Sequence, residues 1–356
     1  MFIFNWVIIL SSLITSAFAV ELNSSILILN QADLNNCPTQ LQKVVSLGNR
    51  RVNIIPTFYL ELDKDNKAKS YWFRDIHAQP IPLSHSITRD YQNKLSICIK
   101  KANDLNLSPT VTVHLDDLKQ RIWRRKINFS PLQRYKNFSF KEAILDQTYQ
   151  SLLFSKFSPE LYLTGEMDLS FARYTAQYYK IASGYKKDVK IGVSFNFNRV
   201  FKAPSINMEM PFDMVGISNY LPVPSSCSKD SFKKHIKKIK KQLKKVGLDH
   251  LPLNFNEIGL GGFSKRMPAI LITIFPHKGV SGKQNIETDP WTSTSKREIR
   301  YKYHKCLLSF LKETNDIKSA FLWNLDSWDV QGLYHYSTGY KDSKIQDLIY
   351  RHNSTQ

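Results

Sequence analysis

Residues 160–197 read ELYLTGEMDLSFARYTAQYYKIASGYKKDVKIGVSFNF. Glu160–Thr164 and Val189–Phe197 are short apolar runs of the length and composition of buried strands. Leu169–Gly184, which lies between them, has the spacing of apolar residues that a helix shows. Because two strands joined by a helix lie parallel in one sheet, this stretch predicts a parallel α/β fold.

The same alternation of strands and helices continues on both sides of this unit. Six further apolar runs predict strands, at Ser25–Leu29, Asn53–Leu60, Pro109–Leu115, Met214–Tyr220, Leu251–Ile258 and Ala320–Leu325. Four further segments predict helices, at Thr88–Asn103, Phe140–Phe157, Lys229–Val246 and Ser295–Thr314. Eight strands with intervening helices favour an α/β fold of the (β/α)8 TIM barrel type over an open doubly wound sheet. The GxGxxG motif of dinucleotide-binding domains follows none of these strands.

The composition is that of a globular protein. Of the 356 residues, 42% are hydrophobic and 22% are charged, which excludes a chain that is disordered throughout. A TIM barrel often fills this length as a single domain, so we expect one domain over residues 20–356. The chain has too few cysteines for a disulfide scaffold, and three ways of forming two disulfides stay open. The cysteines are Cys37, Cys98, Cys227 and Cys306.

The first 19 residues, MFIFNWVIILSSLITSAFA, are typical of an export signal. An apolar stretch from Phe2 to Ile14 precedes Ala17-Phe18-Ala19, the small-x-small pattern of a cleavage site. The alternative is an uncleaved membrane anchor, but the segment is barely long enough to span a bilayer and contains four hydroxyl residues. We therefore expect a secreted protein, periplasmic or extracellular, whose cysteines meet an oxidising compartment.

Two connections between the predicted elements are long. Lys64–Thr88 follows the second predicted strand, and Ser264–Thr294 follows the seventh. In a TIM barrel, the connections that follow strands lie at the C-terminal face, where active sites are built. We therefore expect both connections to be loops that form the walls of a cleft.

Two glutamates stand at the ends of predicted strands. Glu166 follows the fourth strand and Glu257 lies at the end of the seventh, so a barrel places both at its C-terminal rim. One exposed glutamate would be an ordinary loop residue, but a pair favours catalysis. Retaining glycosidases need such a pair, with one carboxylic acid protonating the leaving oxygen and one carboxylate attacking the anomeric carbon about 5–5.5 Å away. An inverting enzyme, the alternative, would separate them by about 6.5–9.5 Å.

Several segments, taken in order, resemble glycoside hydrolase family 113 of clan A, a family known for endo-β-1,4-mannanase activity. Together they lie between roughly residues 50 and 330, and they are NIIPTFYLE, VTVHLDD, IWRRKINFSP, LTGEMDLS, MVGISNYLPV, LNFNEIGLGG, DPWTSTS and FLWNLDSW. The resemblance implies a retaining TIM-barrel hydrolase without a cofactor or metal. It assigns the acid/base role to Glu166 and the nucleophile role to Glu257.

The resemblance also implies a set of substrate-binding residues: His114, Asp116, Trp123, Arg124, Tyr220, Trp291 and Trp323. For each of them a purely structural role is the alternative, as a satisfied core histidine, a packed aromatic residue or part of a basic surface loop. One position departs from the pattern. Many clan A enzymes have Asn before the acid/base glutamate, where it contacts the sugar 2-hydroxyl, and this chain has Gly165.

The expected chemistry also follows from the residue types. Glu166 must be protonated near neutral pH to act as an acid, and a nearby Glu257 carboxylate would raise its pKa. Once Glu257 is bonded to the sugar, its charge is gone, and Glu166 can lose its proton and activate water. Tyr220 could donate a hydrogen bond to Glu257, and Trp323 offers a flat face for a sugar ring.

The chain is strongly basic, with a net charge of +20. Lys233–Lys245 (KKHIKKIKKQLKK) has apolar residues at helical spacing, so it predicts an amphipathic helix with a lysine-rich outer face. That face is either simply solvated or a contact for an anionic surface. No nucleic-acid-binding motif accompanies the charge, and HExxH and GxSxG are absent.

These observations predict a secreted, monomeric, retaining glycoside hydrolase that cleaves a β-linked polysaccharide, with β-1,4-mannan as the best single substrate. The alternative is a catalytically inactive TIM barrel that binds a glycan or an anionic surface.

Overall fold

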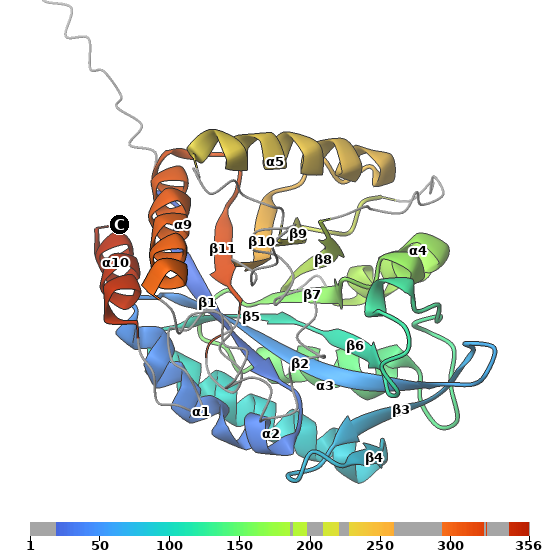
Figure 1. The fold of residues 1–356 in the computed structure, drawn as a ribbon. Coiled ribbons are helices and arrows are strands. Elements are labelled where there is room, and N and C mark those ends of the chain that lie inside the picture. Colours follow the sequence, from blue (N-terminus) through green and yellow to red (C-terminus); the bar gives the residue numbers. More distant parts are fainter. Residues whose placement is uncertain are drawn as a thin grey trace, which may run out of the picture.

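The structure is a computed structural model, and it describes residues 19–185, 188–197, 209–220, 228–259, 294–323, 325 and 342–355. Within these residues, eight parallel strands form a closed barrel (Figure 1). In order around the barrel they are β1 (Leu22–Ile28), β2 (Arg51–Leu62), β5 (Ser108–Thr112), β7 (Glu160–Gly165), β8 (Lys190–Asn196), β9 (Met214–Asn219), β10 (Leu253–Ile258) and β11 (Ser319–Leu322). The barrel closes because β1 pairs with both β2 and β11. The predicted TIM barrel is confirmed.

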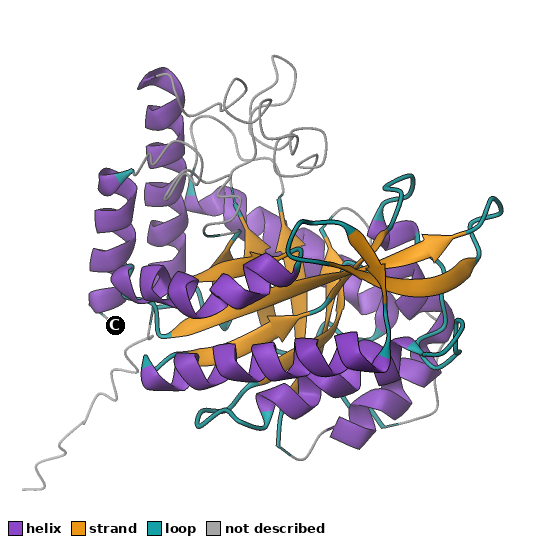
Figure 2. Ribbon diagram, turned by 90° about the horizontal axis from the view of Figure 1, so that it is seen from below, coloured by secondary structure: helices purple, strands orange, loops and turns teal. Residues whose placement is uncertain are grey.

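Helices cover the outside of the barrel (Figures 1 and 2). They are α1 (Gln31–Ser46), α2 (His85–Asp104), α3 (Asp146–Leu152), α4 (Asp168–Tyr185), α5 (Lys229–Leu243), α9 (Thr294–Glu313) and α10 (Ser343–Ser354). The sequence did not predict α1 or α10. Helix α1 is rich in polar residues and contains Pro38, which hides its apolar spacing. The Asn30 side chain marks its start by accepting a hydrogen bond of 2.9 Å from the backbone N–H of Asp33.

The third barrel position is filled by an interrupted strand. β5 and β6 (His114–Asp117) both pair with β2, in parallel, and Val113 lies between them. Strand β2 runs beyond the barrel, and its outer half forms a hairpin with β3 (Ala68–Arg74), which is extended by β4 (Pro80–Pro82) (Figure 1).

The prediction that Lys64–Thr88 is a loop was wrong for most of its length. It contains β3 and β4, in which Tyr71 and Phe73 are buried. Because the turn that joins β2 to β3 is short and polar, the sequence did not reveal the two additional strands that follow it. The other long connection, Ser264–Thr294, lies outside the described residues except for its last residue.

One disulfide joins two outer helices. Cys37 of α1 and Cys98 of α2 are bonded, with 5.8 Å between their Cα atoms, and both are fully buried. Of the three pairings left open by the sequence, only the one that contains Cys37–Cys98 fits this bond. Cys306 is also disulfide-bonded, and no described cysteine is free.

The amino-terminal segment, residues 1–18, lies outside the described residues, so the export signal stays a prediction. Among the helices that the structure does describe, none combines the length and the hydropathy that a membrane-spanning helix requires.

Candidate active site

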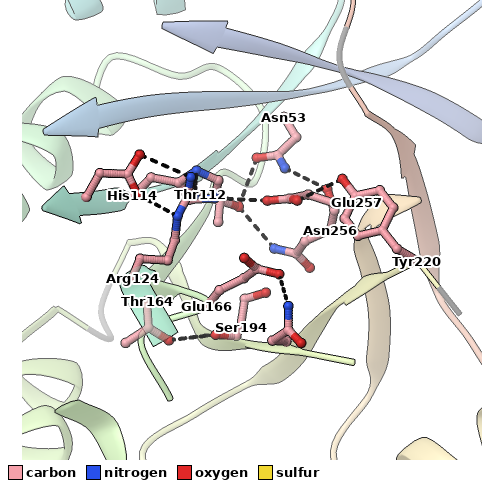
Figure 3. A network of polar contacts seen from close by, with 12 residues as sticks. Asn53, Thr112, His114, Arg124, Thr164, Glu166, Ser194, Tyr220, Asn256 and Glu257 are labelled. Atoms are coloured by element: carbon pink, nitrogen blue, oxygen red, sulfur yellow. Dashed lines mark hydrogen bonds and ion pairs between the residues drawn. The ribbon is translucent and has the colours of Figure 1, made fainter. Parts of the chain in front are cut away.

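Glu166 and Glu257 lie at the same end of the barrel, as the sequence predicts (Figure 3). Glu257 is the second-to-last residue of β10, and Glu166 directly follows β7. Both are almost fully buried, since only 5% of the surface of Glu166 and 3% of that of Glu257 are exposed. Glu166 has a φ of 59°, in the left-handed region that non-glycine residues rarely adopt. Such backbone strain is often found at functional positions, where the surrounding structure holds it.

Polar groups from two other strand ends contact the Glu257 carboxylate. The Tyr220 hydroxyl, just after β9, donates a hydrogen bond of 2.9 Å to Oε2. His114 Nε2, on β6, lies 2.9 Å from Oε1. The contact between His114 and Glu257 is short, but it lacks the alignment of a hydrogen bond. Its effect is therefore mainly electrostatic. The predicted hydrogen bond from Tyr220 to Glu257 is confirmed.

Different side chains hold the Glu166 carboxylate. Trp123 Nε1 donates a hydrogen bond of 3.3 Å to Oε2, and Asn196 Nδ2 donates one to Oε1. The sequence singled out Trp123 but not Asn196. Asn196 is the last residue of β8. A polar amide at the end of a predicted strand, directly after VSF, was the signal that could have identified it.

Arg124, Asp116 and His114 are linked to one another. The Arg124 guanidinium binds both carboxylate oxygens of Asp116, with Nε–Oδ1 2.8 Å and Nη2–Oδ2 3.3 Å. Its Nη1 also bonds His114 Nδ1. The sequence predicted all of these residues as substrate-binding. The structure brings them together, but it uses their polar groups in contacts with each other.

A polar layer lies directly beneath the two glutamates, inside the barrel. The Thr112 hydroxyl donates to Asn53 Oδ1, and Asn256 Nδ2 donates to the Thr112 hydroxyl, each at 3.0 Å. Asn53 Nδ2 donates to the backbone carbonyl of Asn256, also at 3.0 Å. Buried amides are costly unless they are paired, so this closed ring fixes the strand ends that carry the site.

Burial and charge shift the pKa values of both glutamates. Burial raises the pKa of Glu257 to about 7, while the Arg124 charge and the Tyr220 hydrogen bond pull it down. Burial and the Glu257 charge raise the pKa of Glu166, while Arg124, His114 and the Asn196 hydrogen bond lower it. Two buried carboxylates with raised pKa values, one of them raised partly by the charge of the other, are the arrangement expected of an acid and a base at one site.

Aromatic residues form the rest of the described rim. Trp323, just after β11, is buried and stacks on His114, with 6.0 Å between ring centroids. Among the described residues, none accepts a hydrogen bond from its indole N–H. Trp123 lines both the site and a neighbouring cavity of about 860 Å³, whose other walls include Arg121, Tyr135 and Tyr174. Trp291, predicted to bind substrate, lies outside the described residues.

Comparisons with known proteins identify similar structures. No family model matches the chain, and no curated protein matches it. Among solved structures, a glycoside hydrolase family 113 β-1,4-mannanase has a TM-score of 0.58 at 12% identity, covering 95% of this chain and 100% of that one. A family 113 β-mannanase from Alicyclobacillus acidocaldarius has a TM-score of 0.57 at 11% identity, covering 95% and 98%.

A family 5 enzyme from Bifidobacterium longum has a TM-score of 0.51 at 12% identity, covering 91% of this chain and 73% of that one. These likenesses confirm at the level of the fold the resemblance to clan A that the sequence motifs predict.

Proposed function

We propose that this protein is a glycoside hydrolase that cleaves a β-linked glycan with retention of configuration. The observation that carries the proposal is the pair of buried glutamates, Glu166 and Glu257, at the C-terminal ends of β7 and β10. A barrel has no structural need for two buried carboxylates at one end, because each costs free energy to desolvate. The pair is what a double-displacement reaction requires.

The surroundings support the two roles that we propose. Burial raises the pKa of Glu257 to about 7, but the Arg124 charge and the Tyr220 hydrogen bond oppose this rise, so above that pH Glu257 is the anion that can attack the anomeric carbon. The Glu166 carboxylate accepts its hydrogen bonds from Trp123 and Asn196, which are neutral donors. Burial and the Glu257 charge raise its pKa, which favours the protonated form that donates to the leaving oxygen.

The reaction then proceeds in two steps. Glu257 attacks the anomeric carbon while Glu166 protonates the departing oxygen, which gives a covalent glycosyl–enzyme. The Glu257 charge is now lost, so the pKa of Glu166 falls. Glu166 then takes a proton from water, which attacks the anomeric carbon and releases the sugar.

A β-1,4-mannan is our proposed substrate, cut within the chain by a secreted, monomeric enzyme. Two observations support it: the β-mannanases among the similar solved structures, and the cavity beside Trp123, which has room for further sugar units. The residues that contact the cleaved sugar would include Trp323, whose buried N–H has no described acceptor. The export signal predicted at residues 1–19 supports secretion.

Release of reducing sugar tests the proposal. Protein lacking residues 1–19 would be assayed on mannan, glucomannan, cellulose, xylan and chitosan, beside Glu257→Gln and the control Glu313→Gln. Glu313 is an exposed carboxylate that pairs with Lys229 far from the site. We expect release from mannan, a loss of about 10⁴-fold in Glu257→Gln and no loss in the control. Activity that survives in Glu257→Gln would contradict the assigned nucleophile.

A second candidate function rests on helix α5. Its outer face carries exposed lysines that pair with no carboxylate among the described residues: Lys233, Lys234, Lys237, Lys238 and Lys241. Such a face suits an anionic polymer or surface. If the folded wild type releases no sugar, binding to a polyanion that is lost at high salt and in Lys237→Glu/Lys241→Glu would favour an inactive binding barrel.

A further inference from the structure

Gly165 is a position where this fold accepts no side chain. A Cβ built there would lie 2.2 Å from His114 Cδ2, 2.7 Å from His114 Nε2 and 2.8 Å from the Val113 carbonyl oxygen. Two of these three atoms belong to the imidazole ring. The His114 ring therefore occupies the space that the side chain of residue 165 would fill, and the glycine lets it approach Glu257.

The partners of His114 decide where its proton sits. Arg124 Nη1 bonds His114 Nδ1, and a guanidinium can only donate. Nδ1 must therefore be an acceptor, which leaves the proton of a neutral imidazole on Nε2. Nε2 is the nitrogen that lies 2.9 Å from Glu257 Oε1.

Asp116 holds the arginine that makes this choice. It binds the guanidinium through both carboxylate oxygens, a fork-to-fork geometry that fixes the plane of the donor. Asp116 is two residues after His114 on β6, so their side chains share one face of the strand. Arg124 is 8% exposed, so it would be costly to bury without such partners.

We propose that Gly165, Arg124 and Asp116 are positioning residues that hold His114 as a neutral imidazole with its proton on Nε2, facing Glu257. The proposal rests on the proposed function in that Glu257 is the nucleophile. The other titratable groups around the ring are Glu166, after β7, and Tyr220, after β9.

A neutral imidazole suits a nucleophile whose charge disappears during the reaction. A protonated His114 would form a strong ion pair with Glu257, and that pairing would be lost when the ester forms. A neutral N–H beside the carboxylate interacts with it more weakly, so less interaction is lost on going from anion to ester. The positive charge near Glu257 comes instead from Arg124, which lies on the other side of His114. This charge is already balanced by the carboxylate of Asp116.

Nitrogen chemical shifts of 15N-labelled histidine test the tautomer directly. The full chain has 9 histidines, and His114 is identified by the signal that His114→Gln removes. We expect a neutral ring protonated on Nε2 from about pH 5 to pH 8, and mixed or doubly protonated states near pH 5 in Arg124→Met. A wild-type signal with the proton on Nδ1, or on both nitrogens, would overturn the proposal. Because this readout needs no activity, it separates failure of the proposal from failure of the proposed function.

A mutant cycle tests the role of Gly165. We expect Gly165→Ala to lower kcat by about 10²-fold and the melting temperature by about 5 °C, with Gly184→Ala as a matched control. Gly184, near the end of α4, has open space at its Cβ position, so its substitution should leave kcat unchanged and should not lower the melting temperature. In a His114→Ala background only the Val113 carbonyl contact remains, and the same Gly165→Ala change should cost less than half as many degrees. Equal costs in both backgrounds would show that Gly165 does not serve His114.

Arg124→Met gives a catalytic readout that a purely structural pair would not affect. Loss of the cation should move the acidic limb of the kcat/KM profile to higher pH by about one unit. Arg134→Met removes an exposed Arg–carboxylate pair, with Glu142, and should leave the limb in place. An unmoved limb in a folded Arg124→Met would overturn the role of Arg124.

Discussion

Glu166 and Glu257 are the same residue type, buried to the same degree at one end of one barrel, yet their neighbours differ. Glu257 faces a phenol, an imidazole and, at longer range, a guanidinium. Glu166 is held by an indole N–H and an amide. The difference teaches that neighbouring strand ends can give identical side chains different electrostatic surroundings, and the opposite roles that we propose for them rest on these surroundings.

The largest expected effect separates the two glutamates by leaving group. On an aryl β-mannoside whose leaving group needs no protonation, Glu166→Gln should keep the rate of sugar transfer to Glu257 within about 10-fold of the wild type. Glu257→Gln should lose about 10⁴-fold on the same substrate, because no other group attacks the anomeric carbon. Burst kinetics of aryl release measure this step. Similar losses in both variants would remove the distinction between the two sites.

A smaller effect is expected on the pH profile of kcat/KM. Removing one hydrogen bond from each glutamate should move the acidic limb in one variant and the basic limb in the other. The Tyr220 hydrogen bond lowers the pKa of Glu257, so Tyr220→Phe should raise it and move the acidic limb upward by about one pH unit. The Asn196 hydrogen bond lowers the pKa of Glu166, so Asn196→Ala should raise it and move the basic limb upward. Profiles of kcat/KM measure both limbs. Movement of the same limb in both variants would contradict the assigned roles.

The smallest expected effect is on stability. The folded-state pKa of Glu257 is raised to about 7, from 4.5, so the folded protein binds more protons than the unfolded chain between these values. Stability therefore falls as the pH rises through this window. Glu257→Gln should remove that loss and stabilise the protein by ~1–3 kcal/mol at pH 8 relative to its effect at pH 4. Urea unfolding at both pH values measures it, and an effect that is equal at the two pH values would contradict burial as the cause of the shift.

The strands were predictable because their signal is local. Each predicted strand lies on one barrel strand, and Glu166 and Glu257 were found because both follow apolar runs at strand ends. The β3–β4 hairpin and helices α1 and α10 were missed. Their apolar residues are mixed with polar ones, and only packing against the barrel gives them a buried face.

The contacts of the site were harder to predict because they join residues that are far apart in the sequence. Asn196 meets Glu166 only because β7 and β8 are neighbours in the barrel. Arg124 was predicted to bind substrate, but in the structure its guanidinium donates to Asp116 and His114.

By itself, the sequence determined the parallel barrel, the two carboxylates and the aromatic rim, because apolar periodicity and the ends of apolar runs are local properties of the chain. Only the tertiary structure decided which groups surround each carboxylate, why residue 165 must be glycine and which cysteine pairs with Cys37. These features depend on distances between residues brought together by barrel closure, and hydrogen bonding, charge and steric exclusion act over such distances whatever the separation along the chain.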